Sequence, residues 1–106
     1  MRELEPAQLQ EYLDACEQPP YLLDVRQPWE YDICHLQGSE LIPMSEIQAR
    51  VQELDPDRET VVICHHGIRS RAVARFLAEV GFSQVINLKG GIDGWARTID
   101  VSMATY

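Results

Sequence analysis

The residue of this sequence best suited to chemistry is a cysteine within the run Cys64-His65-His66-Gly67-Ile68-Arg69-Ser70. Three β-branched residues, 61–63, precede it and predict a buried strand, and an apolar face of helical period follows the run. Cys64 would then stand where a strand gives way to a helix, the edge at which open α/β sheets bind ligands. Gly67 permits a positive φ, so the short loop can turn successive backbone N–H groups inward as a nest for an anion.

A thiol held at this place is expected to lose its proton readily. The amino-terminal end of the following helix carries partial positive charge, which stabilises an anion. Arg69, and His65 or His66 when protonated, would add to that effect and make a thiolate nucleophile available near neutral pH. The alternative is that Cys64 is only the buried last residue of a strand, because free cysteine is often a core residue.

The elements that must position this loop alternate between strand and helix. Short apolar runs predict strands at residues 21–25, 41–42, 61–63 and 85–88. Helical segments are predicted to begin near Pro6, near Pro28 and at Ser45, which has the N-cap pattern with Gln48; another precedes Gly81, and a last turn leads to Trp95. This order implies right-handed crossovers and therefore an α/β fold with a mostly parallel sheet.

Length, composition and charge set further limits. The 106 residues fit a single domain, 1–106, and an apolar content of 45% can fill a modest core. A net charge of −8 makes nucleic acid an unexpected partner, because phosphate contacts need clustered Lys and Arg. No apolar run approaches the ~18 residues of a membrane span, and the first residues do not resemble a secretory signal, so we expect no membrane association and a cytoplasmic location. Three widely spaced cysteines are expected there as free thiols.

Three blocks of the sequence, in order, resemble the signatures of rhodanese-homology domains. They are Leu23-Asp24-Val25-Arg26 with Glu30-Tyr31 and the downstream His35, Gly38 and Ile42-Pro43, the run from Cys64 to Ser70, and Leu88-Lys89-Gly90-Gly91 with Trp95. The resemblance covers nearly the whole chain. It implies a mostly parallel central sheet flanked by helices on both faces, with Asp24 and Arg26 as a structural pair at a strand end.

The resemblance also implies sulfurtransferase activity by double displacement. Cys64 would be the catalytic residue, taking sulfane sulfur as a persulfide from a small anionic donor such as thiosulfate or a persulfide. The binding loop would consist of His65, His66, Gly67, Ile68, Arg69 and Ser70. A thiol, cyanide or a protein cysteine would accept the sulfur, and no metal or organic cofactor is expected. The alternative to an enzyme is a catalytically idle rhodanese-like interaction or regulatory module, although such modules often lose the cysteine.

Loop length distinguishes sulfur from phosphate chemistry among proteins that share this scaffold. Related dual-specificity phosphatases use a longer loop of the form Cys-x5-Arg. Here Arg69 gives Cys-x4-Arg, and Ser70 occupies the position that a phosphatase needs for arginine. The spacing therefore favours sulfur over phosphate. An arsenate reductase or a phosphatase on the same scaffold is a third, weaker alternative.

The roles of several further residues remain open at the level of sequence. His65 and His66 could tune pH dependence or serve only through their backbone, and Arg69 could contact substrate or pair with a carboxylate such as Glu30. Cys34 stands where the resembled family usually has glycine, and Cys16 lies on the apolar face of the first predicted helix, where we expect a core residue. Close ligand pairs are absent, so zinc binding is not expected.

Overall fold

The computed structural model describes residues 1–106 and is built around a five-stranded sheet in which every pair of neighbours is parallel. The strand order across the sheet is β1-β5-β4-β2-β3. The strands are β1 (Arg2–Leu4), β2 (Tyr21–Asp24), β3 (Glu40–Leu41), β4 (Thr60–Ile63) and β5 (Val85–Leu88). Because the central position belongs to β4, the residue that follows it lies in the middle of the sheet's carboxyl edge.

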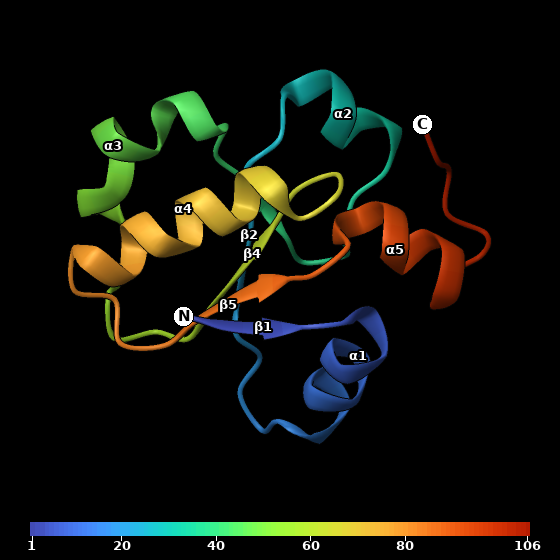
Figure 1. The fold of residues 1–106 in the computed structure, drawn as a ribbon, viewed down its shortest axis with the longest axis horizontal. Helices are drawn as coiled ribbons and strands as arrows, with labels where there is room; N and C mark the ends of the chain where they lie inside the picture. Colours follow the sequence, from blue (N-terminus) through green and yellow to red (C-terminus); the bar gives the residue numbers. More distant parts are fainter.

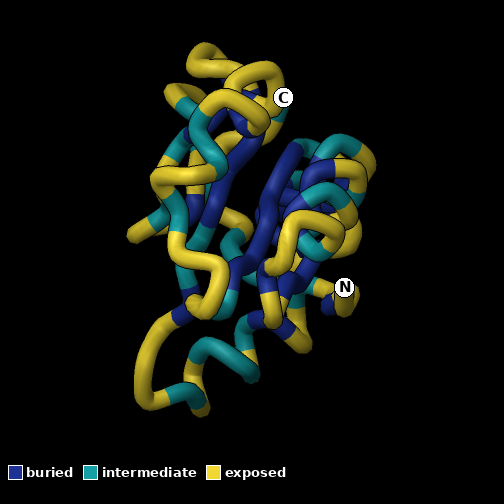
Figure 2. Tube along the Cα trace, turned by 90° about the vertical axis from the view of Figure 1, so that its left-hand side faces the viewer, coloured by how far each residue is buried: buried dark blue, intermediate teal, exposed yellow.

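Helices cover both faces of the sheet, as Figure 1 shows. They are α1 (Pro6–Ala15), α2 (Pro28–Ile33), α3 (Ile47–Arg50), α4 (Ile68–Glu79) and α5 (Gly91–Thr98), with short 3-10 turns at Met44–Glu46 and Val51–Glu53. α3 and α4 pack on one face, and α1 and α5 pack on the other. The buried strands therefore form a middle layer between partly exposed helices (Figure 2). The predicted α/β fold with a parallel sheet and helices on both faces is confirmed.

Alternation along β4 assigns its side chains to two hydrophobic cores. Val62 and Cys64 belong to the core under α3 and α4, whereas Val61 and Ile63 belong to the core under α1 and α5. Successive strand residues point to opposite faces, so both sides of this central strand are apolar, as a strand covered by helices requires. The sulfur of Cys64 is thereby directed to the side on which α4 begins.

The structure corrects three local predictions. Residues 2–4 form an edge strand that the sequence does not reveal, because only Leu4 among them is apolar and buried. Ser45 is not an N-cap: it lies inside the 3-10 turn that precedes α3, and Pro43 holds the cap position without a side-chain bond. Cys16 is half-buried at the end of α1, where its thiol donates to the carbonyl oxygen of Leu13, and is not a core residue.

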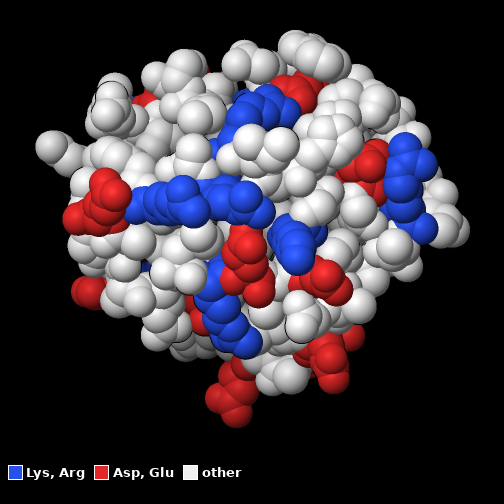
Figure 3. Space-filling view, viewed as in Figure 1, with Lys and Arg blue, Asp and Glu red and all other residues white.

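The surface carries charges of both signs. On the face drawn in Figure 3, Lys and Arg side chains lie beside Asp and Glu side chains. Ion pairs such as Arg71 with Glu3 and Arg50 with Glu46 join side chains of opposite charge. This face therefore offers no unbroken positive surface of the kind that phosphate backbones need. None of the helices is both long and apolar enough to cross a bilayer.

Candidate active site

The sulfur of Cys64 lies at the junction of β4 and α4, surrounded by hydrogen-bonding groups. The residue is only 1% exposed. Its Sγ accepts hydrogen bonds from the backbone N–H groups of Gly67, at 3.1 Å, and Ser70, at 3.3 Å, and the thiol donates to Ser70 Oγ at 3.2 Å. Gly67 has φ 94°, the left-handed conformation that the tight loop requires. These donors stabilise negative charge on the sulfur.

A buried polar chain fixes the serine that faces this sulfur. Ser70 Oγ donates to Asn87 Oδ1 at 2.5 Å, and Asn87 Nδ2 donates to the carbonyl oxygen of Gly67 at 3.2 Å and to Glu3 Oε1 at 2.9 Å. Asn87 is fully buried in β5 and thus ties the middle of the loop, at Gly67, to its end, at Ser70. Asn87 was not among the predicted site residues, although an amide within an apolar strand was the available signal.

Four further N–H groups of the loop have no hydrogen-bond acceptor within the chain. They belong to His65, His66, Ile68 and Arg69. The last two are unsatisfied by helical geometry, because the first N–H groups of a helix have no intrahelical partner. Together with the two that already contact Sγ, they supply donors for an anion at the head of α4.

The loop is also held from the other side by the start of α5. The N–H of Ile92 donates to the carbonyl oxygen of Cys64 at 2.8 Å, and the N–H of Asp93 donates to that of His65 at 3.0 Å. This contact needs glycine at position 91, since a Cβ there would lie 2.4 Å from the oxygen of His65. The Gly90-Gly91 turn therefore helps to hold the loop in place. Position 91 must be glycine because the backbone of the turn lies so close to the backbone of Cys64 and His65.

Arg69 is paired with a carboxylate, which is one of the two roles left open for it. Its Nη1 and Nη2 donate to Glu30 Oε2 and Oε1, each at 2.8 Å. Glu30 is almost fully buried in α2 and also accepts the N–H of Gln27 at 2.9 Å. The Arg69 guanidinium, with smaller help from the Gln27 N–H, lowers the pKa of Glu30 to about 2 against the cost of burial. Arg69 thus braces the loop against α2.

This ion pair predicts an acid-sensitive component of stability. Because the pKa of folded Glu30 lies below its ordinary value of 4.5, its contribution is present above pH 4.5 and is lost as the pH falls toward 2. That contribution is on the order of 3 kcal/mol. Urea unfolding at pH values from 7 to 2.5 should show a shallower acid decline for Glu30→Gln than for wild type. The exposed Glu53→Gln control should retain the wild-type slope, and parallel curves for Glu30→Gln and wild type would contradict the pairing.

The two histidines of the loop lie in different surroundings. His65 is half-buried and stacks on the ring of Tyr106, with centroids 3.8 Å apart and planes within 8°. Burial lowers the pKa of His65, and the neighbouring His66 makes a smaller contribution in the same direction. The buried Nε2 of His65 has no hydrogen-bond partner. The surroundings of His65 therefore favour its neutral imidazole form over the charged form. His66 is exposed, with Nδ1 3.9 Å from Asp93 Oδ2.

The predicted scaffold pair of Asp24 and Arg26 forms a fully buried ion pair, with Arg26 Nη2 2.7 Å from Asp24 Oδ2. The same guanidinium donates to the carbonyl oxygen of Cys34 at 2.6 Å and to the hydroxyl of Tyr106 at 2.9 Å. Burial raises the pKa of Tyr106 to about 12, so its hydroxyl stays protonated and donates to Glu30 Oε1 at 2.8 Å. Nothing in the sequence pattern around Tyr106 marks it as part of the site.

The remaining candidates lie outside the sulfur's immediate surroundings. Ile68 is 75% exposed and places an apolar side chain on the surface beside the loop. Cys34 ends α2 in an extended conformation that any residue adopts, so the absence of glycine there costs no strain. No group of three or more His, Cys, Asp or Glu side chains is arranged to hold a metal ion.

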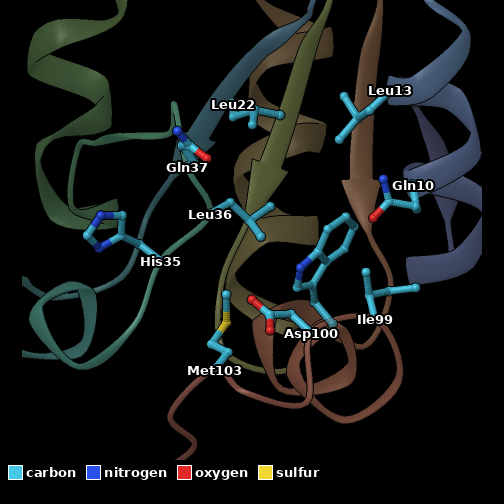
Figure 4. Close-up of a pocket in the computed structure, with 10 residues that line it drawn as sticks. Gln10, Leu13, Leu22, His35, Leu36, Gln37, Ile99, Asp100 and Met103 are labelled. Atoms are coloured by element: carbon cyan, nitrogen blue, oxygen red, sulfur yellow. The ribbon is translucent and has the colours of Figure 1, made fainter.

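The largest pocket of the molecule lies apart from this loop. It has a volume of about 500 Å³ and contains none of the residues from 64 to 70. Figure 4 shows its lining, which comes from α1, β2, α5, the segment after α2 and the segment after α5. The lining includes Leu13, Leu36, Ile99 and Met103, with no cysteine and no basic side chain other than His35. The Cys64 loop is therefore not part of this pocket.

Comparison with known proteins gives matches along most of the chain. A family model described as rhodanese-like domain matches residues 5–98. The chain is 37% identical over 103 residues to the probable adenylyltransferase/sulfurtransferase MoeZ of Mycobacterium tuberculosis, covering 95% of this chain and 26% of that protein. It is also 37% identical over 82 residues to the thiosulfate sulfurtransferase GlpE of Pseudomonas fluorescens, covering 77% of this chain and 75% of that protein.

Solved structures resemble the fold over nearly its full extent. A rhodanese-related protein from Thermoplasma volcanium has a TM-score of 0.80 at 35% identity and covers 92% of both chains. A rhodanese-like domain protein from Staphylococcus aureus has a TM-score of 0.82 at 25% identity, covering 90% of this chain and 91% of that one. By contrast, this chain spans only 26% of MoeZ and 40% of the putative sulfur carrier protein YrkF of Bacillus subtilis.

Proposed function

Since this chain belongs to the rhodanese-like domain family, we propose that it is a sulfurtransferase that carries sulfane sulfur as a persulfide on Cys64. The proposal gives Cys64 the catalytic role and the loop of residues 65–70 the role of binding the transferred sulfur. Relatives named as sulfurtransferases and as a sulfur carrier support it at the level of reaction class.

In the first half-reaction the Cys64 thiolate attacks the outer sulfur of a donor such as thiosulfate. A bond forms between Sγ and that sulfur while the sulfur–sulfur bond of the donor breaks, so sulfite leaves with the electron pair and Cys64–S–S⁻ remains. The reaction needs no metal or organic cofactor, because the electrons that form the new bond come from the thiolate.

The observation that carries the proposal is the set of backbone donors around the sulfur. Two N–H groups already donate hydrogen bonds to Sγ. The four free N–H groups of the loop can donate hydrogen bonds to the negatively charged outer sulfur of the persulfide. Donors fixed in advance stabilise a developing anion without reorganisation, as in an oxyanion hole. The bonds from α5 and Asn87 to the loop carbonyls hold that arrangement rigid.

In the second half-reaction a thiophilic acceptor takes the outer sulfur. Cyanide would leave as thiocyanate, while a thiol or a protein cysteine would leave as a persulfide, and in each case Cys64 regains its thiolate. Cyanide serves as a test acceptor, whereas a thiol or a protein cysteine is the acceptor that we propose for the cell.

The pairing of Arg69 speaks against phosphatase activity on the same scaffold. Both of its Nη groups donate to Glu30, so the pair of donors that would bind a phosphate end-on is already occupied by a carboxylate. We therefore expect no hydrolysis of aryl phosphates under conditions in which sulfur is transferred.

Steady-state kinetics with thiosulfate and cyanide test the proposed function. A covalent persulfide predicts a ping-pong pattern, in which double-reciprocal plots at several cyanide concentrations are parallel. Intersecting plots would show that both substrates must bind together and would contradict a free persulfide intermediate. Absence of turnover with thiosulfate and with glutathione persulfide would favour an idle interaction module.

A further inference from the structure

The side chain of Tyr106 connects two ion pairs. Its hydroxyl accepts a hydrogen bond from Arg26 Nη1 at 2.9 Å and donates one to Glu30 Oε1 at 2.8 Å. Arg26 belongs to the buried pair with Asp24, and Glu30 is the carboxylate that holds Arg69. One hydroxyl thus links the ion pair at the end of β2 to the ion pair at the start of α4.

The ring of Tyr106 also touches the loop directly. It lies parallel to the imidazole of His65, the residue after Cys64, with ring centroids 3.8 Å apart. The edge of the Trp29 ring contacts it, with centroids 5.7 Å apart and an angle of 71°. Tyr106 is therefore fixed by its ring as well as its hydroxyl, yet it makes no hydrogen bond to the reacting sulfur.

We propose that Tyr106 is a positioning residue for sulfur transfer, acting through Glu30 on Arg69 and through its ring on His65. The inference rests on the proposed function and assigns a residue that supports the binding of an anionic donor. A hydroxyl that donates to a carboxylate disperses part of its negative charge. More of the positive charge of Arg69 is then left to attract a donor such as thiosulfate to the loop.

The variant Tyr106→Phe isolates the hydroxyl, because it keeps the ring and its stacking. We expect the KM for thiosulfate to rise about three- to tenfold while kcat stays within about twofold of wild type. Tyr31→Phe is the matched control. Tyr31 also stacks on a histidine, His35, at 3.9 Å and donates its hydroxyl to the carbonyl oxygen of Ser39, but that hydroxyl makes no hydrogen bond to Arg26, Glu30 or Arg69. That control should keep the wild-type KM.

Alkylation of Cys64 gives a second readout that does not depend on sulfur transfer. Iodoacetate is an anion and iodoacetamide is neutral. The rate of alkylation of Cys64 by iodoacetate divided by the rate with iodoacetamide therefore reports the charge that an approaching anion meets. In Tyr106→Phe this ratio should fall at least about threefold relative to wild type and to Tyr31→Phe. Circular dichroism at the assay temperature confirms that the compared variants are folded.

Two results would overturn the proposal. One is a Tyr106→Phe variant that matches Tyr31→Phe in both the KM and the alkylation ratio, and the other is a loss confined to kcat. If wild type itself transfers no sulfur, the proposed function fails, whereas the alkylation ratio still decides whether Tyr106 controls the charge beside Cys64.

Discussion

Cys64→Ser should lose sulfur transfer by a factor on the order of a thousand or more while keeping the wild-type fold. A serine hydroxyl can accept the same hydrogen bonds from the N–H groups of Gly67 and Ser70, so both donors keep a partner. It is, however, a far weaker nucleophile than a thiolate near neutral pH and cannot form a persulfide. Turnover of thiosulfate with cyanide measures the loss, and circular dichroism measures the fold.

Cys16→Ala is the control for this result. Cys16 is half-buried at the end of α1 and makes only a local hydrogen bond to Leu13. We expect turnover within about twofold of wild type, as for most substitutions away from the site. Comparable losses in Cys16→Ala and Cys64→Ser would mean that the assignment of the nucleophile is wrong.

Gly91→Ala should have the largest effect on the framework of the site. The added Cβ would lie 2.4 Å from the oxygen of His65 and 2.5 Å from that of Cys64, and both are backbone atoms that cannot rotate away. The φ of 62° adds the cost of a left-handed conformation. We expect a loss of more than about 3 kcal/mol in the free energy of unfolding, measured by urea denaturation. Any folded fraction should have impaired turnover, because the loop must move to relieve the contact.

Gly38→Ala separates backbone conformation from close approach. Gly38 has φ 82°, and no atom lies within 4 Å of a Cβ built there. This variant should lose only the roughly 1–2 kcal/mol of a left-handed alanine and keep full activity. If Gly91→Ala were as stable and as active as Gly38→Ala, the tight packing of α5 against the loop would not be required.

The parts of the fold that follow from local patterns were predictable. The β-branched run before Cys64 indicated a buried strand, and the structure shows β4 there with both faces covered. The alternation of strands and helices, joined by right-handed crossovers, indicated the parallel sheet. Cys64 could be proposed as the nucleophile from sequence because strand end, glycine loop and helix start are all adjacent along the chain.

Features that depend on contacts between distant residues were not predictable. Asn87 reaches the loop across the sheet, and the hydrogen bond between Arg26 and Tyr106 joins residues 80 positions apart. The pairing of Arg69 with Glu30 could be named as an option, but only the packing of α2 beside the loop decides it. The edge strand β1 carries a single buried residue and forms because β5 offers it a partner.

Intact-mass measurement tests the central claim most directly. Wild type and Cys64→Ser are incubated side by side with thiosulfate, freed of excess reagent and weighed before and after reduction. A persulfide carried on Cys64 predicts the addition of one sulfur atom to wild type only, and the removal of that sulfur by a reducing thiol. Equal addition to Cys64→Ser, or no addition to wild type with either thiosulfate or glutathione persulfide, would contradict a persulfide carried on Cys64.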